Sequence, residues 1–395
     1  MKSKQIAIGL ISLWWPPIRG GATVYIHRMG ELLWEKGISI GAVTASPEST
    51  AVSRSDSFPV ERIGNVPEPG NFSWVDAYAR KAFPKWKADV LQWAGRFEPT
   101  HVVLSQDPFE KKALVKDLQS MGIKVGCVWH EYAAMPLLLD LLSVYLKTES
   151  WEETLATVYQ SERSGKTRHH DAEDSPLQWG IDFLITSNNW TRMFLDPLET
   201  IPSFTLHPPI PLDVDTPCES LSPHVTVSML NPIPPKGALN MAIIVNYGDD
   251  RWTHRILKGG WGNGFETFLP LIDFPVWVSG RVHSEEFVDD IRSFYRGGEV
   301  FAFPSRAEGY GMAAAEAILC GVPTIATDLP GIQEAVGEGA LMIPYKASGF
   351  AWIEGVQTVL DNKAEWTEKA LKRKALLLKR QEEQANGLVD FLNRI

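Results

Sequence analysis

Two glutamates and two glycines lie close together in one short stretch of the chain. Glu308, Gly309 and Gly311 follow an apolar segment, residues 300–303, and seven residues separate Glu308 from Glu316. Carboxylates accept hydrogen bonds from hydroxyl groups, and glycine lets the backbone turn sharply and approach a ligand closely. This spacing predicts a ligand site that combines acidic side chains with exposed backbone amides.

The residues around these glutamates predict a strand, a glycine loop, a helix and a second strand in succession. Residues 300–303 are apolar strand formers, residues 312–319 are strong helix formers, and Gly321 with Pro323 ends that helix. The loop therefore lies at a helix N-terminus, whose free amides favour a phosphate group. Two acids on a helix usually mark a solvated face, but Glu308 follows a buried strand, where open α/β sheets bind ligands.

Length and composition favour a globular protein of two domains. The chain has 395 residues, of which 44% are hydrophobic and 22% charged. Its net charge of -10 argues against nonspecific binding to nucleic acid or anionic lipid. Three cysteines without metal-ligand spacing do not suggest a disulfide framework and fit a reducing compartment. Because no apolar run has the length of a membrane span, we expect a cytoplasmic protein with at most peripheral association at the inner membrane face.

The stretch around Glu308 resembles the family 4 glycosyltransferases, which are retaining enzymes of the GT-B type. That type is an α/β fold of two Rossmann-like domains, whose parallel sheets face each other across a cleft. The resemblance covers nearly the whole chain, specifically after residue 225 and loosely before it. It is carried by Pro304-Ser305, Glu308-Gly309-Tyr310-Gly311, Glu316-Ala317, Gly321-Val322-Pro323, and Gly331 with Glu334.

The resemblance implies transfer of a sugar from a nucleotide-diphosphate sugar, with a UDP-sugar favoured, to a glycan, lipid-linked or small-molecule acceptor. It implies no catalytic metal and no cofactor beyond this co-substrate. Glu308 is expected to contact the donor sugar, Glu316 to hold the ribose hydroxyls, and Lys236 to stabilise the departing diphosphate. The other residues that it assigns to the donor are Gly20, Gly21, Asn231, Arg281, Val282, Gly309, Tyr310, Gly311, Met312 and Ala313.

Lys236 precedes Gly237 at the head of a predicted helix, where a compact positive charge is a plausible diphosphate ligand. Many family members have Gly-Arg-Leu, three further residues, and then Lys-Gly at this place. Asn231 occupies the position of that arginine. The sequence therefore predicts either one cation fewer at the diphosphate or a second cation from elsewhere, such as Arg281.

His130 and Glu131 end a predicted strand, residues 124–129, at the kind of edge where ligand crevices form. The family commonly has His followed by Asp there, close to the donor sugar. His130 is therefore the third expected catalytic residue, after Glu308 and Lys236. Glu131 replaces the aspartate, and an acceptor-binding role for it stays open.

The N-terminal residues predict a strand over 5–13, a loop containing Trp14, Trp15 and Gly20-Gly21, and a helix over 23–36. The apolar run superficially resembles a signal peptide, but it lacks a convincing cleavage site and is followed by prolines and an arginine. Trp14 and Trp15 are interpreted either as core residues or as a platform for the acceptor, a sugar or a lipid. Gly20-Gly21 is a second candidate anion cradle.

The expected domains are an N-terminal Rossmann-like acceptor-side domain over 1–206 and a C-terminal Rossmann-like nucleotide-sugar-binding domain over 224–378. Alternating strands and helices support both domains independently of the resemblance. A proline-rich segment without periodicity, residues 207–223, is interpreted as the linker. The family's last helix crosses back to the first domain, and residues 379–395 are expected to do so.

Three local expectations concern single elements. Helical residues 74–97 are expected to break at Pro84. Residues 276–279 predict a strand that ends at Gly280-Arg281-Val282, and Ser284 is the expected cap of the helix that follows. Asp213 and Asp215 resemble the metal-binding triplet of a different glycosyltransferase fold, but in a linker we expect them to bind no metal.

Two other functions stay open. A NAD-dependent oxidoreductase would use the fingerprint that begins Gly309-Tyr310-Gly311, with Asp328 as the acid that binds the ribose. Against it, five residues separate the predicted strand from Gly309. The other alternative is a catalytically inactive nucleotide-sugar-binding protein, for which Asn231 is the hint.

Overall fold

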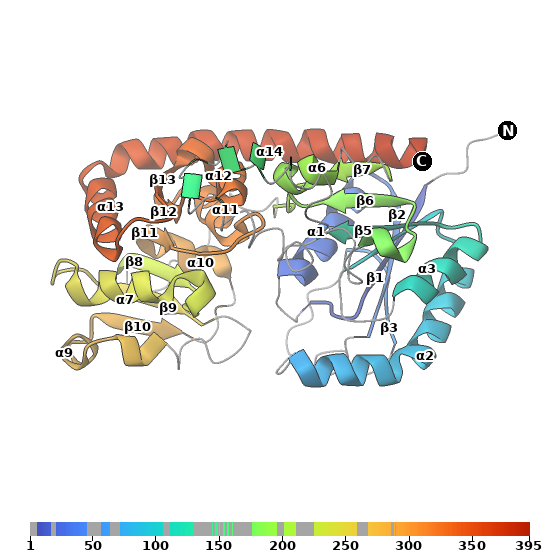
Figure 1. The fold of residues 1–395 in the computed structure, drawn as a ribbon, viewed down its shortest axis with the longest axis horizontal. Helices are drawn as coiled ribbons and strands as arrows, with labels where there is room; N and C mark the ends of the chain where they lie inside the picture. The colour runs from blue at the N-terminus through green and yellow to red at the C-terminus, as the bar shows by residue number, and fades with distance from the viewer. Residues whose placement is uncertain are drawn as a thin grey trace. The chain divides into compact units, whose positions relative to one another are not determined.

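The computed structural model describes two compact units. The N-terminal unit comprises Met1–Pro209 and Gln381–Ile395, and the C-terminal unit comprises Ile210–Arg380 (Figure 1). The described residues are 6–16, 21–45, 57–63, 72–105, 111–129, 176–195, 201–210, 225–258, 268–285, 288 and 290–395, with single residues between 144 and 160.

The N-terminal unit is built on a seven-stranded sheet with the order β3-β2-β1-β4-β5-β6-β7. Every neighbouring pair of strands is parallel. Strands β1, β2, β4, β5 and β6 are buried along nearly their whole length, as strands covered on both faces must be. The strands are β1 (Ala7–Ser12), β2 (Ser39–Thr44), β3 (Val60–Arg62), β4 (His101–Leu104), β5 (Lys124–Trp129), β6 (Phe183–Thr186) and β7 (Ser203–Thr205).

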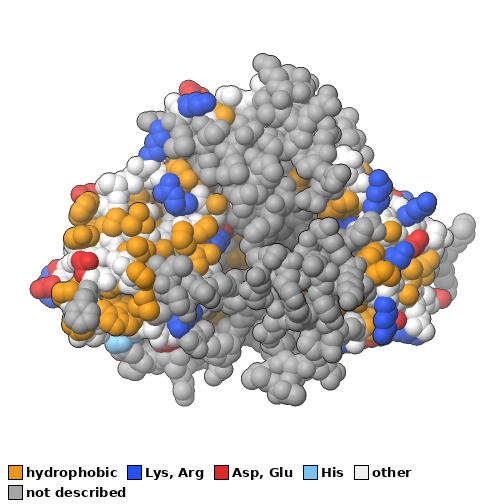
Figure 2. Space-filling view, turned by 60° about the horizontal axis from the view of Figure 1, so that its bottom comes forward, with side chains coloured by type: hydrophobic (Ala, Val, Ile, Leu, Met, Phe, Trp, Pro, Cys, Tyr) orange, Lys and Arg blue, Asp and Glu red, His pale blue; other side chains and the backbone are white. Residues whose placement is uncertain are grey.

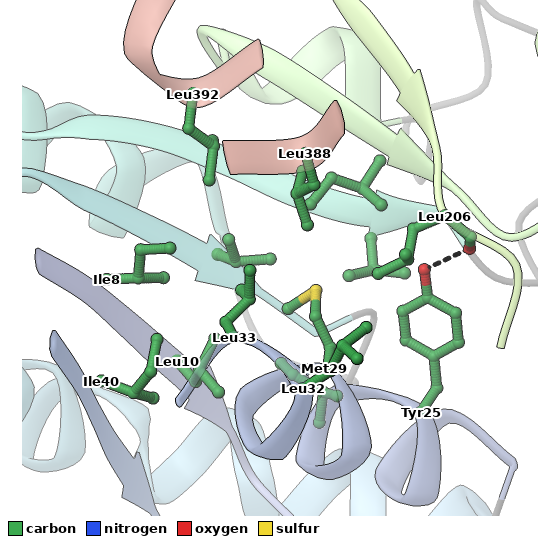
Figure 3. Close-up of a cluster of buried hydrophobic side chains, with 14 of the residues drawn as sticks. Ile8, Leu10, Tyr25, Met29, Leu32, Leu33, Ile40, Leu206, Leu388 and Leu392 are labelled. Atoms are coloured by element: carbon green, nitrogen blue, oxygen red, sulfur yellow. Dashed lines mark hydrogen bonds between the residues drawn. The ribbon is translucent and has the colours of Figure 1, made fainter. Parts of the chain in front are cut away.

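The core of the N-terminal unit joins helix α1 (Gly21–Glu35) to β1 and to the end of helix α14 (Lys363–Arg394) (Figure 3). The residues of α1 that belong to this core are Tyr25, Ile26, Met29, Leu32 and Leu33. The Tyr25 hydroxyl donates to the Leu206 carbonyl oxygen at 2.6 Å. Leu388 and Leu392 of α14 pack against the same cluster.

Three more helices and a short 3-10 helix belong to the N-terminal unit: α2 (Phe72–Phe97), α3 (Lys111–Ser120), α6 (Asn189–Leu195) and η3 (Pro176–Trp179). The expected break at Pro84 is wrong, since α2 is continuous through it. Proline removes one helical hydrogen bond. Burial of Phe83, Trp86, Val90 and Trp93 on one face offsets that loss.

The C-terminal unit has a six-stranded parallel sheet with the order β10-β9-β8-β11-β12-β13. Its strands are β8 (Val225–Leu230), β9 (His254–Leu257), β10 (Val282–Glu285), β11 (Gly298–Phe303), β12 (Thr324–Thr327) and β13 (Ala340–Ile343). Its helices are η6 (Pro234–Lys236), α7 (Ala238–Tyr247), η7 (Leu269–Leu271), α9 (Phe274–Val278), α10 (Ile291–Arg296), α11 (Met312–Leu319), α12 (Pro330–Val336), η8 (Gly337–Gly339), α13 (Gly349–Asp361) and the first part of α14.

In both sheets the first strand lies between the second and the fourth, which is the doubly wound order. The order therefore reverses between β1 and β4 in one unit and between β8 and β11 in the other. Ligands of such sheets bind outside the carboxyl ends of the strands at this switch point. The predicted fold class, two Rossmann-like domains with parallel sheets, is confirmed.

One strand of the C-terminal unit was predicted in the wrong place. Residues 276–279, expected to be a strand, belong to helix α9 and its end, and Pro275 occupies an early position of that helix. The strand is β10, which contains Ser284, so Ser284 does not cap a helix. Asp290 caps α10 instead, accepting from the Arg292 backbone amide at 2.9 Å.

Hydrophobic side chains gather on the face of the C-terminal unit seen at the left of Figure 2. The Tyr247 and Phe350 ring centroids lie 5.9 Å apart and join α7 to α13. Within the described residues, no helix combines the length and the apolar character needed to cross a membrane. The exposed large hydrophobic residues of helices α7, α9, η7 and α13 are Leu239, Tyr247, Leu271, Trp277, Val278 and Phe350.

Candidate active site

Lys236 and Glu308 meet at the switch point of the C-terminal sheet. Lys236 ends η6, which follows β8, and Glu308 lies in the loop that follows β11. The Lys236 Nζ and Glu308 Oε1 atoms are 2.5 Å apart. The Glu308 side chain is only 7% exposed and the Lys236 side chain 29%. Two residues predicted separately therefore form one charge pair, open to solvent on the lysine side.

Ser305 supplies a second hydrogen bond to the same carboxylate oxygen. Its hydroxyl donates to Glu308 Oε1 at 2.8 Å, and its side chain is fully buried. A buried carboxylate requires such partners, because its loss of hydration is otherwise uncompensated. Ser305 was part of the sequence motif but was not predicted to contact Glu308. Together Lys236 and Ser305 fix the position of the Glu308 carboxylate.

Glycines bring the two loops of the site into direct backbone contact. Gly237 has a φ of 85°, and a Cβ atom there would lie 2.0 Å from the Pro304 carbonyl oxygen. The Arg306 amide donates to the Pro235 carbonyl oxygen at 2.8 Å. The backbone that carries Lys236 is thereby held against the backbone that leads to Glu308.

The glycine loop ends at the N-terminus of α11, as predicted. Gly311 has a φ of 90°, which is strained for other residues, and it forms the N-cap without a side-chain hydrogen bond. The first amides of a helix lack intrahelical acceptors and carry partial positive charge. Met312 and Ala313 are partly exposed, so their amides are suited to an anion beside Lys236.

Glu316 lies further along α11 and is oriented by a tyrosine from the preceding helix. The Tyr295 hydroxyl donates to Glu316 Oε2 at 2.9 Å. Tyr295 is fully buried on α10, and its ring makes an edge contact with Phe301 at 5.1 Å between centroids. The sequence analysis missed Tyr295. The general need of a buried tyrosine for a hydrogen-bond partner was the one signal that could have found it.

A buried arginine, Arg255, contacts helix α10 next to Tyr295. Arg255 of β9 is fully buried and donates from Nε and Nη2 to the two carboxylate oxygens of Glu285, each at 2.8 Å. The same guanidinium lies 5.3 Å from the centroid of the Phe294 ring. Its Nη1 atom lies 3.5 Å from the Ser293 carbonyl oxygen. A guanidinium fixed by a strong, directional two-point ion pair therefore packs against α10 next to Tyr295.

Asn231 follows β8 in the left-handed region, with a φ of 55°. Asparagine tolerates this conformation better than most residues. Its Oδ1 atom is buried and makes no hydrogen bond within the described residues. Asn231 therefore lies at the carboxyl end of β8, as predicted, and its side-chain amide lies there.

Arg281 and Val282 lie at the amino end of β10, which does not favour the donor contacts predicted for them. Arg281 precedes β10 and Val282 begins it, whereas Lys236 and Glu308 follow the carboxyl ends of β8 and β11. Strands of a parallel sheet share one direction, and the length of a strand separates its two ends. Placing the strand at 276–279 had put Arg281 at the wrong end. This place in the sheet does not favour Arg281 as the replacement for the missing arginine.

The side chain of Tyr310 points away from the predicted donor. It is 4% exposed, and burial raises the pKa of its hydroxyl to about 12. Its hydroxyl accepts a hydrogen bond from Arg380 of α14. Only the backbone of Tyr310 can face a ligand, and the prediction of a donor contact is restricted to that backbone.

The tryptophan platform predicted for the acceptor is contradicted. Trp15 is fully buried, with edge contacts to His27 at 5.3 Å and Phe58 at 6.1 Å between centroids. Trp14 is 6% exposed. A stacking platform needs an exposed ring face, so the alternative of two core residues describes them.

The remaining predicted residues belong to the N-terminal unit or to the linker. Gly21 is the exposed first residue of α1. Gly20, His130, Glu131, Asp213 and Asp215 lie outside the described residues. In the part of the chain that the structure describes, no three His, Cys, Asp or Glu residues are grouped so as to hold a metal ion.

Comparison with known proteins adds a family and a fold. A family model described as group 1 glycosyl transferases matches residues 260–362. A curated D-inositol 3-phosphate glycosyltransferase of Paenarthrobacter aurescens (strain TC1) is 36% identical over 50 residues. That match spans 13% of this chain and only 12% of the relative's length.

Solved glycosyltransferase structures resemble the chain along its whole length. Sucrose-phosphate synthase from Thermosynechococcus elongatus aligns with a TM-score of 0.67 and 15% identity over 99% of each chain. HepE from Anabaena aligns with a TM-score of 0.68 and 14% identity over 99% of this chain and 100% of the other. WaaG aligns with a TM-score of 0.63 and 14% identity over 96% and 98%. Residues 260–362 thus resemble the group 1 glycosyl transferases, and the structural matches show that the chain has the GT-B fold of two Rossmann-like domains.

Proposed function

We propose that the protein is a retaining glycosyltransferase that transfers a sugar from a nucleotide-diphosphate sugar, with a UDP-sugar favoured. The observation that carries the proposal is the Lys236–Glu308 pair, with Nζ and Oε1 2.5 Å apart at the switch point of the C-terminal sheet. The N-cap of α11, Gly311, lies three residues after Glu308. A cation, helix amides and a carboxylate are thus combined where such sheets bind ligands.

Each part of this site has a proposed role. Lys236 and the first amides of α11 stabilise the diphosphate as it departs with increasing negative charge. Glu308, held by Ser305, contacts the donor sugar. Glu316, oriented by Tyr295, accepts hydrogen bonds from the ribose hydroxyls. The ion pair of Lys236 and Glu308 then adapts when the diphosphate arrives, because both groups gain a partner.

The solved relatives support UDP as the first nucleotide to test. HepE has been solved with UDP and glucose and with UDP-glucose, and a pneumococcal O-GlcNAc transferase, GtfA, with UDP and GlcNAc. The names of the relatives point to different acceptors, among them a sucrose-phosphate synthase and an enzyme of lipopolysaccharide biosynthesis. We therefore keep the acceptor as a glycan, a lipid-linked or a small-molecule acceptor.

The oxidoreductase alternative has less support from the geometry. Five residues lie between the end of strand β11 at Phe303 and Gly309, whereas the dinucleotide fingerprint needs its glycines directly after the strand. The carboxylate of Glu308 lies in the intervening loop, where it would repel a pyrophosphate. The Asp328 carboxylate is already bonded to the Gln333 side chain.

A nucleotide panel separates the candidate functions. Melting temperatures are measured with UDP, GDP, NAD and buffer alone, followed by donor hydrolysis with UDP- and GDP-sugars. Selective stabilisation by UDP or GDP, together with slow hydrolysis of one donor, is the expected result. Stabilisation by NAD alone would favour the oxidoreductase, and nucleotide binding without transfer or hydrolysis would favour the inactive binding protein.

Lys236→Ala is expected to weaken UDP binding about 10- to 100-fold, since a charge-assisted hydrogen bond contributes roughly 1.5–3 kcal/mol. Binding of uridine, which lacks phosphates, should change far less. Calorimetric titration of both ligands checks this. Lys363→Ala is the matched control, because it removes another ion-paired lysine of the same unit, 2.9 Å from Glu299. Equal UDP affinity in wild type and Lys236→Ala would exclude Lys236 from the diphosphate site.

Tyr295→Phe is expected to weaken binding of UDP about three- to tenfold, because it removes one hydrogen bond that orients Glu316. Pyrophosphate binding should be unchanged, since pyrophosphate has no ribose. Competition of UDP and of pyrophosphate against the donor distinguishes the two effects. Tyr247→Phe, at an exposed tyrosine of the same unit, serves as control. A parallel loss of pyrophosphate binding would show that Tyr295 supports the whole site rather than Glu316.

A further inference from the structure

Tyr310 contributes a large buried side chain to the loop that carries Glu308, Gly309 and Gly311. Its ring is buried, and the carbon at the centre of the Arg380 guanidinium lies 5.8 Å from the ring centroid. Arg380 Nη2 also donates to the Tyr310 hydroxyl. The buried side chain of the loop is thus bonded to an arginine that is 70 residues away in sequence.

Arg380 at the same time holds the end of helix α12. Its Nη1 atom donates to the Glu334 carbonyl oxygen at 2.9 Å. The last carbonyl groups of a helix carry partial negative charge, so a guanidinium there is favourable. Helix α12 in turn contacts the loop, because a Cβ atom on Gly331 would lie 2.0 Å from the Gly309 carbonyl oxygen. Arg380 therefore fixes both the buried side chain of the loop and the helix on which the loop rests.

A second arginine on α14 provides an internal comparison. Arg373 lies two turns before Arg380 and donates to the Glu334 carbonyl oxygen at 2.5 Å and to the Ala335 carbonyl oxygen at 3.2 Å. It shares the contact with α12, whereas the hydrogen bond to the Tyr310 hydroxyl described above comes from Arg380. Comparing variants of the two arginines therefore distinguishes the effect of the contact with α12 from the effect of the hydrogen bond to Tyr310.

Helix α14 is itself anchored on the far side of Arg380. One turn later, the Gln384 side chain accepts from the His207 amide at 3.1 Å and contacts His207 Nδ1 at 2.7 Å. Ala385 and Leu388 then enter the core of the N-terminal unit. Arg380 is the last residue of the C-terminal unit on α14.

We propose that Arg380 is a positioning residue for sugar transfer, which acts through the Tyr310 hydroxyl to set the backbone that carries Glu308. The inference rests on the proposed function of Glu308 as the residue that contacts the donor sugar. Glu308 is two residues from Tyr310, and a misplacement of about 1 Å can cost about 100-fold in rate. UDP affinity depends instead on Lys236, Glu316 and α11, which is also held by its own buried face.

The test compares Arg380→Met and Tyr310→Phe with Arg373→Met as control. Tyr310→Phe removes only the hydroxyl, and Arg380→Met removes its donor while keeping an apolar stem of similar length. For each variant we would measure kcat for donor hydrolysis, the UDP dissociation constant, and hydrogen exchange of the amides from Ala307 to Gly311. The double variant Arg380→Met with Tyr310→Phe measures whether the two residues act together.

Arg380→Met and Tyr310→Phe are each expected to lower kcat about 10- to 100-fold and to leave the UDP dissociation constant within about threefold of wild type. Exchange of the loop amides should increase in both. Arg373→Met should lower kcat and raise loop exchange much less than Arg380→Met does, because it weakens only the contact with α12, and the double variant should be no slower than the slower single variant. Equal losses of kcat in Arg373→Met and Arg380→Met, or multiplying losses in the double variant, would overturn the proposal.

Failure of the proposed function would appear differently. In that case wild-type protein would neither bind UDP or GDP nor hydrolyse a donor. The exchange measurement needs no donor and still decides whether Arg380 holds the loop. Unchanged loop exchange in both Arg380→Met and Tyr310→Phe would overturn the positioning role whatever the reaction is.

Discussion

Glu308→Gln is expected to lower kcat about 100- to 1,000-fold, the usual cost of losing one preorganised electrostatic group, while UDP affinity stays nearly unchanged. Glutamine keeps the shape of the side chain and an oxygen that can accept from Ser305 and Lys236. It loses the negative charge that faces the sugar as positive charge develops there. The effect should therefore appear in kcat rather than in nucleotide binding.

Glu316→Gln is the matched comparison, because it makes the same chemical change on the neighbouring helix. Hydrogen bonds to a ribose diol are present in both the ground state and the transition state, so their loss raises KM more than it lowers kcat. Calorimetric UDP titration, steady-state transfer and circular dichroism on both variants measure this division. Full kcat in Glu308→Gln would refute its contact with the donor sugar. Equal loss of UDP binding in both variants would make the two acids one structural unit.

Gly237→Ala is expected to lower the free energy of unfolding by about 2–5 kcal/mol and to abolish most UDP binding. The left-handed conformation costs an L-residue about 1–2 kcal/mol. The new Cβ atom would lie 2.0 Å from the Pro304 carbonyl oxygen, and such overpacking typically costs about 1–3 kcal/mol more. The backbone must then move, and it carries Lys236 away from Glu308.

Gly280→Ala is the control that distinguishes backbone strain from the close contact between residue 237 and Pro304. Gly280 also has a positive φ, 73°, but an added Cβ atom there meets nothing within 4 Å. It should cost about 1–2 kcal/mol and leave UDP binding intact. Urea unfolding and calorimetric titration of both variants provide the comparison. Similar behaviour of the two variants would mean that the close contact at Gly237 does not position the site.

Local signals in the sequence predicted the fold and much of the site. Helix α11 has the predicted bounds, because Gly311 and Gly321 enclose a run of strong helix formers. Strand β5 also has the predicted bounds. The error at β10 has a local cause as well, since residues 276–278 are apolar and two of the three are valines, yet Pro275 starts a short helix. Apolar runs this short do not distinguish a strand from a buried helix.

Long-range partners could not be predicted from the sequence. Lys236 and Glu308 are 72 residues apart, and only the strand order places β8 beside β11. Tyr295 and Arg380 reach the site through contacts that leave no spacing pattern. Trp15 illustrates a different error. Its place in a loop next to a glycine pair suggested an exposed ring, but the ring is buried against His27 and Phe58.

The most direct test of the central claim is to follow donor hydrolysis by proton NMR and to observe which anomer is released first. Wild-type protein is incubated with α-linked UDP- and GDP-sugars, with Glu308→Gln alongside. The proposed retaining mechanism predicts that one donor releases its sugar with the α configuration, and that Glu308→Gln does so about 100-fold or more slowly. Release of the β anomer first, or equal rates from the two proteins, would contradict the account.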